Sequence, residues 1–184
     1  MPELQLLRAD HAPALLSFET ENRAYFAAHV PDRGDAYFEE FGDRHRALLD
    51  EQEAGTVRMH VLVGDGGEVL GRFNLVDLAD GGADLGYRVA EKATRRGVAS
   101  SGVRELCRLA VEEYGLSRLS AVTTVDNTAS RSVLTRLGFG AVGSVTLDGK
   151  PGVAYELDLA DLAGAGRDHD LGGSFGRERS GTSS

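Results

Sequence analysis

The stretch TRRGVASSGVRELC (94–107) joins a short loop to an amphipathic helix. Gly97 stands where that helix is expected to begin, with Arg95 and Arg96 directly before it and small residues after it. The first turn of a helix presents backbone N–H groups that lack partners and carries a partial positive charge. Phosphate is the natural ligand for such a turn, and arginine strengthens its binding. The stretch therefore favours a diphosphate-binding turn.

A solvated loop is the alternative interpretation of the same residues, with the arginines balancing Glu91 and Asp84. Two established phosphate motifs do not apply. The Walker pattern GxxxxGK[ST] is absent, and the GxGxxG spacing of dinucleotide-binding folds is missing. Taken alone, the stretch leaves the diphosphate turn and the solvated loop both open.

The flanking sequence predicts a mixed α/β fold of the α+β type. Helices are expected at 10–29, 35–53, 98–114 and 127–137, and strands at 4–8, 57–63, 68–78, 83–90, 116–125, 141–147 and 153–159. This order predicts a largely antiparallel central sheet flanked by helices on both faces. We expect one domain at 1–163. The remainder, 164–184, is rich in glycine, serine and charge, which predicts a disordered tail.

Composition limits the classes of partner. The net charge is −9, which argues against a nucleic-acid or membrane-surface binder and suits a cationic partner, although solubility alone also explains it. Cys107 is the one cysteine, so no internal disulfide forms, and its leucine neighbours predict a buried thiol. No signal peptide or membrane-spanning stretch is evident, so we expect a cytoplasmic protein. The histidines lack metal-ligand spacing, so no metal is expected.

Five segments together closely resemble the GNAT superfamily of acyl-CoA-dependent N-acetyltransferases, and within it the RimJ/RimL-type group. They are ENRAYF (21–26), GRFNLVDL (71–78), LGYRV (85–89), RRGVAS (95–100) and NTASRSVLTRLGF (127–139). The family's glycine-rich signature, Q/R-x-x-G-x-G/A, falls on Thr94, Gly97 and Ala99. Thr94 departs from that pattern, although Arg95 and Arg96 can supply the charge.

The resemblance implies acetyl-CoA as the co-substrate. The N–H groups from Arg96 to Ser100 would hold its diphosphate, and the backbone of Tyr87–Val89 would pair with its pantetheine arm as an added strand does. The coenzyme-binding residues implied in this way are Tyr87, Arg88, Val89, Arg95, Arg96, Gly97, Val98, Ala99, Ser100, Asn127 and Ser130.

The same resemblance suggests catalytic residues. In RimJ/RimL-type proteins the residue matching Asn127 contacts the coenzyme, and the residue matching Ser130 is a candidate proton donor to its sulfur; helix capping and solubility are the alternative roles. Leu134 stands where many other GNAT enzymes carry a tyrosine. Asp84 is the expected general base, and an ordinary exposed aspartate is the equal alternative. His60 is expected to point away from the apolar residues on its strand.

The acceptor is expected to be a primary amine, on a protein N-terminus or a small molecule, that attacks acetyl-CoA directly in a ternary complex. Asn22, Phe26 and Asn74 are the expected acceptor contacts, because the family builds that site from its first helices and the strand hairpin; packing in the core is the alternative role of Phe26. The protein is expected to be a monomer or homodimer with no nucleic-acid or membrane partner. A non-catalytic acyl-CoA-binding module and a nucleotide-phosphate-binding domain remain the alternatives.

Overall fold

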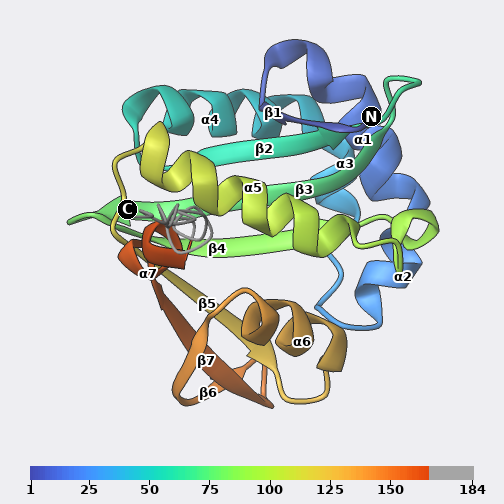
Figure 1. Cartoon of the computed structure of the whole chain (residues 1–184). Helices are drawn as coiled ribbons and strands as arrows, with labels where there is room; N and C mark the ends of the chain where they lie inside the picture. The colour runs from blue at the N-terminus through green and yellow to red at the C-terminus, as the bar shows by residue number, and fades with distance from the viewer. Residues whose placement is uncertain (166–184) are drawn as a thin grey trace, which may run out of the picture.

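The computed structural model describes residues 1–165, which form a seven-stranded sheet flanked by helices (Figure 1). The strands lie in the order β1-β2-β3-β4-β5-β7-β6. Their bounds are β1 (Glu3–Leu6), β2 (Arg58–Val63), β3 (Val69–Ala79), β4 (Gly82–Val89), β5 (Arg118–Thr124), β6 (Gly140–Leu147) and β7 (Lys150–Asp158). Every neighbouring pair is antiparallel except β4 and β5. The predicted mixed, largely antiparallel sheet is therefore confirmed.

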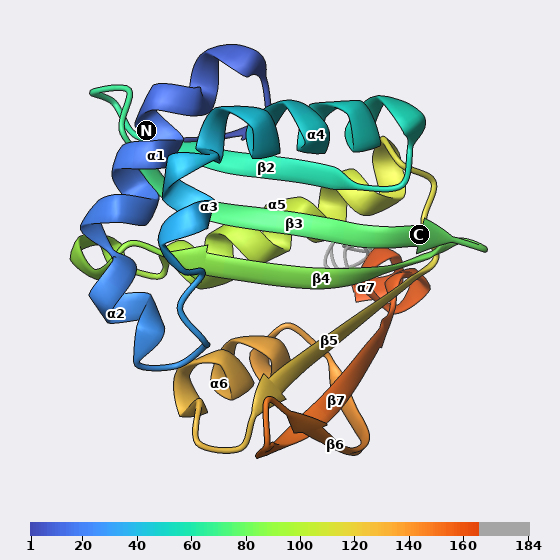
Figure 2. The same cartoon turned by 180° about the vertical axis from the view of Figure 1, so that it is seen from behind.

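Helices cover both faces of the first half of the sheet. Helix α5 crosses one face over β3 and β4, while α1 and α4 pack on the other, against β3 and β2 (Figures 1 and 2). The helical segments are η1 (Ala9–His11), α1 (Ala12–Glu21), α2 (Arg23–Ala27), α3 (Asp35–Glu39), α4 (Phe41–Ala54), η2 (Glu91–Ala93), α5 (Val98–Glu112), α6 (Thr128–Arg136) and α7 (Leu159–Ala165). This arrangement confirms the predicted layers.

Both helices expected near the start of the chain are interrupted. Asn22 separates α1 from α2, and Glu40 separates α3 from α4. The Asn22 amide is buried between two backbone segments: Nδ2 donates to the Phe18 carbonyl (2.9 Å), and Oδ1 accepts the Glu91 N–H (2.9 Å). The apolar pattern continues across these one-residue breaks, which is why it predicted two uninterrupted helices.

The last described element differs from the prediction. The final strand ends at Asp158, and Leu159 begins α7 instead of ending the strand. Leu159 is 2% exposed, so the apolar side chain that suggested a strand fills the core from a helix. The tail expected at 164–184 overlaps the last two residues of α7 and otherwise lies outside the described residues.

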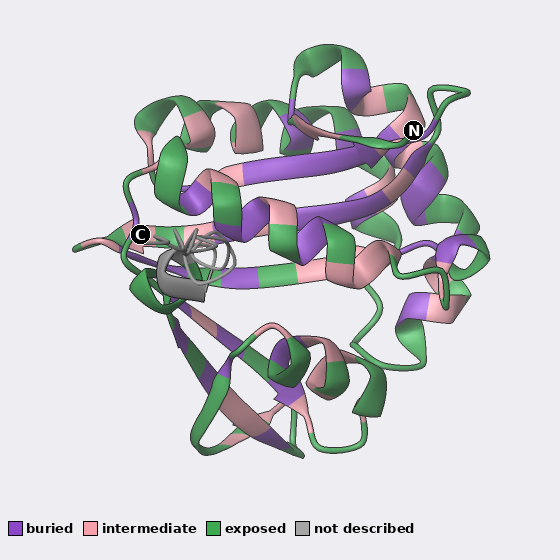
Figure 3. Cartoon of the chain, viewed as in Figure 1, coloured by how far each residue is buried: buried purple, intermediate pink, exposed green. Residues whose placement is uncertain are grey.

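The core lies on both sides of β2 and β3, where buried residues run almost without interruption (Figure 3). His60 points to the face opposite its apolar neighbours, as strand alternation predicts, but α5 covers that face. The His60 Nε2 atom lies 2.6 Å from the Tyr114 hydroxyl, and the residue is 1% exposed. Burial lowers the pKa of His60 to about 4. His60 is therefore a core residue and is not placed to act as a general base.

The two halves of the sheet diverge between β4 and β5. Their ladder is confined to three pairs, Gly82–Arg118, Ala83–Leu119 and Asp84–Ser120. Beyond Asp84, β4 stays paired with β3 as far as Val89 but separates from β5 (Figures 1 and 2). The edge of β4 that faces β5 therefore has backbone N–H and C=O groups free of ladder partners over residues 85–89, and these are groups that seek hydrogen bonds.

Candidate active site

A cavity of about 480 Å³ occupies the space where β4 and β5 diverge. Its walls come from β4, β5, α6, the segment between α2 and α3, and the turn between β6 and β7. The residues that line it are Ala27, His29, Val30, Pro31, Leu85, Gly86, Tyr87, Ala121, Val122, Thr123, Thr124, Asn127, Ser130, Leu134, Leu147, Asp148 and Lys150. Segments that lie far apart in the sequence thus meet where β4 and β5 separate.

Ser130 is fixed in this cavity from two sides. Asn127 caps α6, and its Oδ1 atom accepts the Ser130 N–H (3.2 Å). The Tyr87 hydroxyl donates to Ser130 Oγ (3.2 Å). Asn127 thus caps the helix, the alternative role given above, while both Asn127 and Ser130 also line the cavity.

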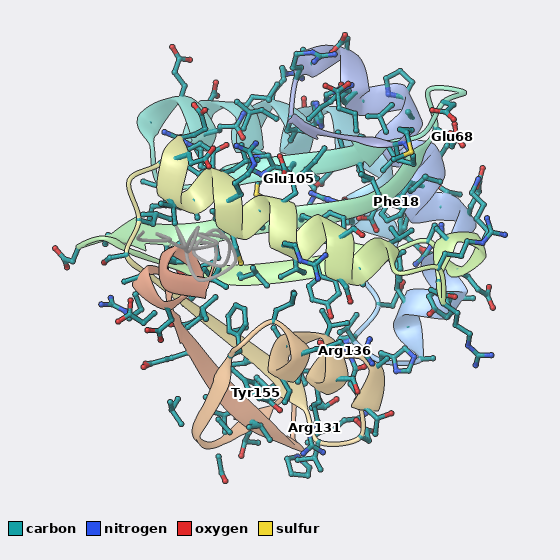
Figure 4. The ribbon with its side chains drawn as sticks, in the orientation of Figure 1. Phe18, Glu68, Glu105, Arg131, Arg136 and Tyr155 are labelled. Carbon is teal, nitrogen blue, oxygen red and sulfur yellow. The ribbon has the colours of Figure 1, made fainter. Side chains whose placement is uncertain are left out.

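Helix α6 is also held to the strands beneath it. The Arg131 Nε atom donates to the Tyr155 hydroxyl (3.4 Å), and its guanidinium also donates to the Val125 carbonyl (3.1 Å) (Figure 4). Tyr155 belongs to β7 and is 4% exposed, so it offers a buried anchor. The first turn of α6, and Ser130 with it, is therefore positioned by the sheet.

The start of α5 has the backbone geometry of an anion site. Gly97 has φ 73°, and Arg95, two residues earlier, has φ 60°, which is uncommon for a residue with a side chain. The helix has no side-chain cap, and its first hydrogen bond runs from the Ser101 N–H to the Gly97 carbonyl (2.9 Å). The N–H groups of Val98, Ala99 and Ser100 therefore remain available to a ligand.

The arginines before α5 are exposed rather than neutralised. Within residues 1–165, neither Arg95 nor Arg96 forms an ion pair, whether with Glu91 or with Asp84. The charge pairing of the solvated-loop interpretation is therefore not seen among the described residues. Two guanidinium groups that have no ion pair in residues 1–165 lie beside N–H groups without helical partners, an arrangement suited to a diphosphate and here called the cradle.

Acetyl-CoA fits the features of this site. The free edge of β4 begins beside the cavity at Leu85 and ends at Val89, and η2 then leads the chain to Gly97. A pantetheine arm can hydrogen-bond to that edge while the diphosphate meets the cradle and the thioester lies near Ser130. Arg88 contributes only its backbone to this edge, because its guanidinium turns to the α1 face and binds Glu19 (3.1 Å). The side chains of Arg88 and Val89 therefore pack against the rest of the protein.

The acceptor contacts predicted from sequence do not line the cavity. The Asn22 side chain is hydrogen-bonded at both polar atoms, to the Phe18 carbonyl and the Glu91 N–H. Phe26 is 8% exposed, packs on Phe18 (5.4 Å between ring centroids), and lies 4.6 Å from the Arg88 guanidinium. Asn74 lies on β3 opposite Gly86, with a buried Oδ1 that has no partner in the described part of the chain. The segment that follows Phe26, from Ala27 to Pro31, lines the cavity instead.

Asp84 also lies outside the cavity lining. Its side chain is exposed, on the face of β4 opposite to Leu85 and Tyr87, at the last pair before the strands separate. The titratable groups that do line the cavity are His29, Asp148 and Lys150, besides Tyr87. Asp148 has φ 50° and precedes Gly149 in the turn between β6 and β7, and this turn reaches the cavity.

Other chemistry is limited in the described residues. Cys107 is 2% exposed, which confirms the predicted buried thiol, and burial raises its pKa to about 12. Among residues 1–165 no cluster of three or more potential metal ligands occurs. Over the same residues no helix has the length and apolarity needed to cross a membrane.

Comparison with known proteins identifies the class. Residues 3–140 match the model of the acetyltransferase (GNAT) domain, and the chain belongs to this family. Among curated relatives, the putative ribosomal N-acetyltransferase YdaF of Bacillus subtilis is 32% identical over 117 residues, which cover 62% of this chain and 61% of that protein. The uncharacterised N-acetyltransferase p20 of Bacillus licheniformis is 31% identical over 88 residues, 47% of this chain and 49% of that protein. The chain thus spans about half to three fifths of these relatives.

Solved structures with the same fold include two of the RimJ/RimL kind. The ribosomal-protein-S5-alanine acetyltransferase of Vibrio fischeri superposes with a TM-score of 0.81 at 19% identity, over 87% of this chain and 94% of that one. RimJ of Mycobacterium smegmatis, solved with a CoA disulfide, gives a TM-score of 0.77 at 22% identity, over 89% and 88% of the two chains. At these identities the likeness establishes the fold.

Proposed function

We propose that this protein transfers the acetyl group of acetyl-CoA to a primary amine, by direct attack in a ternary complex. The observation that carries the proposal is the separation of β4 from β5 between the cradle at Gly97 and the hydroxyl of Ser130. A free strand edge that joins an anion cradle to a cavity has the form required by a long thioester with a diphosphate at one end. Membership of the GNAT family supports the same chemistry.

The proposed mechanism relies mainly on position. Bringing the amine and the thioester together in one cavity can supply several kcal/mol of barrier reduction. A terminal amine with a pKa of about 8 and a thiol with a pKa of about 8.5 need little help to exchange protons near neutral pH. The Ser130 hydroxyl would donate to the departing sulfur, while a backbone N–H of the free β4 edge would donate to the oxyanion.

His29 and Asp148 are the proposed proton acceptors for the amine. Both line the cavity from segments other than the helix that carries Ser130, whereas Asp84 does not line it. A carboxylate also attracts an approaching ammonium group, which agrees with the acidic balance of the chain. The amine's two surplus protons then have destinations: one ends on the thiol and the other passes to solvent through these groups.

The proposed acceptor is a protein N-terminal amine or a small-molecule amine. YdaF and the Vibrio and Mycobacterium structures bear names of ribosomal N-acetyltransferases, which favours the protein N-terminus. We propose that residues 1–163 act as a single cytoplasmic domain, as a monomer or homodimer. Binding would involve neither nucleic acid nor membrane.

A thiol-release assay tests the proposal. Acetyl-CoA is supplied with a panel of N-terminal peptides, polyamines and amino compounds, and free CoA thiol is followed together with product mass. Release that depends on one acceptor class supports the transferase. Tight acetyl-CoA binding with no acceptor-dependent release supports the non-catalytic module, and displacement of acetyl-CoA by ATP supports the nucleotide-binding alternative.

A further inference from the structure

The hydroxyl groups of Tyr87 and Ser130 meet at the wall of the cavity. The Tyr87 hydroxyl lies 3.2 Å from Ser130 Oγ, and both residues line the cavity. The Tyr87 ring stacks on Phe73, with centroids 5.9 Å apart and planes at 11°. Phe73 is fully buried, so the phenol is held in one direction by the core.

The direction of this hydrogen bond follows from the acidity of the two groups. A phenol is a far stronger acid than an aliphatic hydroxyl, so Tyr87 is the natural donor and Ser130 the natural acceptor. Burial raises the pKa of Tyr87, with the bond to Ser130 opposing that shift, so the phenol keeps its proton around neutral pH. The donor role is therefore maintained where the enzyme would work.

A serine hydroxyl that accepts one hydrogen bond has its own proton left to donate elsewhere. With one lone pair of Ser130 Oγ engaged by Tyr87, and the backbone of Ser130 fixed by Asn127, the Ser130 proton is directed away from Tyr87. Leu134, one helical turn later, lines the same cavity and has no polar group to compete for that proton. Hydrogen bonds in series also polarise one another, which strengthens the Ser130 donor.

We propose that Tyr87 is a positioning residue whose hydroxyl sets the Ser130 hydroxyl as a donor toward the sulfur of acetyl-CoA. This inference rests on the proposed function. When the carbon–sulfur bond breaks, its electron pair stays on sulfur, which accepts the proton of Ser130. The Ser130 oxygen is stabilised by the Tyr87 hydrogen bond until it takes up one of the two protons that the amine loses, and the other proton passes to solvent. Tyr87 itself keeps its proton throughout.

The test is a double-mutant cycle in the full-length protein, read as kcat and as the KM for acetyl-CoA. Tyr87→Phe keeps the ring on Phe73 and removes only the hydroxyl, so kcat should fall by about tenfold, the effect of one hydrogen bond. Ser130→Ala should lower kcat by about 10² or more, as expected for loss of a general acid. Because Tyr87 acts through Ser130, adding Tyr87→Phe to Ser130→Ala should cost nothing further, and KM for acetyl-CoA should stay near the wild-type value.

Tyr114→Phe is the matched control. It removes another half-buried phenol hydroxyl, which bonds His60 beyond the last turn of α5 and does not line the cavity, so kcat should be unchanged. An unchanged kcat in Tyr87→Phe, an equal loss in both backgrounds, or a change in KM alone would each overturn the inference. Wild-type protein that releases no thiol with any acceptor would overturn the proposed function and this inference together.

Discussion

Phe73 and Gly102 meet where α5 crosses β3, and a Cβ on Gly102 would overlap the Phe73 ring. The ring fills the space that the missing side chain leaves, and it stacks on the Tyr87 ring. The close approach of α5 to the sheet therefore depends on a residue without a side chain in the middle of a helix.

Gly102→Ala should destabilise the protein by about 1–3 kcal/mol, because the added methyl group overpacks a filled core. Denaturant unfolding followed by circular dichroism measures the loss. Gly42→Ala in α4 is the control, since a Cβ there meets nothing within 4 Å. That substitution should be neutral or stabilise slightly, through the usual preference of helices for alanine. Equal effects of the two substitutions would show that the contact with Phe73 carries no energetic weight.

Gly97→Val should weaken acetyl-CoA binding by tenfold or more, on the order of the 1–2 kcal/mol that a left-handed conformation costs a residue with a side chain. Gly97 has φ 73°, so a β-branched residue forces the cradle to change shape. Isothermal titration calorimetry gives the affinity. Gly115→Val, at the other end of the same helix segment with φ 63°, should carry similar strain without loss of affinity. Wild-type affinity in Gly97→Val would remove the cradle from coenzyme binding.

Asn22→Ala should lower the free energy of unfolding by about 1–3 kcal/mol, because it leaves a buried backbone carbonyl and N–H without partners. The KM for the acceptor should stay the same, since Asn22 does not line the cavity. Asn74→Ala is a useful comparison, because the Oδ1 atom that it removes has no partner in the described residues. A higher acceptor KM with unchanged stability in Asn22→Ala would restore the acceptor-binding role predicted from sequence.

Stability should fall as the pH is lowered from about 6.5 toward 4. In the folded protein burial lowers the pKa of His60 to about 4, whereas the unfolded chain has the ordinary value near 6.5. Between these values the unfolded state binds more protons, so acid favours unfolding, by on the order of 3 kcal/mol across the whole range. In His60→Leu the unfolding free energy should depend less steeply on pH over this interval. An identical slope in the variant would assign the acid sensitivity to other groups.

The sequence predicted the sheet and its layers because these depend on local patterns. Period-two alternation, glycine-marked turns and the apolar face of α5 are visible over short stretches. Helical spacing places Val103, Leu106, Ala110 and Val111 on that face. The first three are fully buried, whereas Val111 is 39% exposed. Val111 lies at the edge of the apolar face of α5, which explains why it is not buried like the others.

The composition of the cavity could not be predicted in the same way. His29 and Asp148 lie more than a hundred residues apart and meet there only because β4 and β5 separate. The sequence favoured Asn22 and Phe26 as acceptor contacts, because they are a polar and an aromatic residue in the first helices. The helix breaks at Asn22, however, and the segment that follows faces the site instead of these two side chains. Which residue faces a cavity depends on tertiary placement, which no local pattern encodes.

The three residue pairs between β4 and β5 are a narrow connection between two parts of the molecule. The larger part, packed under α5, contains the cradle and most of the core. The smaller part, with α6 and the β6–β7 hairpin, supplies Ser130 and Asp148. Under the proposed function, changes to the exposed hairpin or to the loop of His29 would alter which amine is accepted without touching the core under α5. New acceptor preferences would then carry little risk to folding.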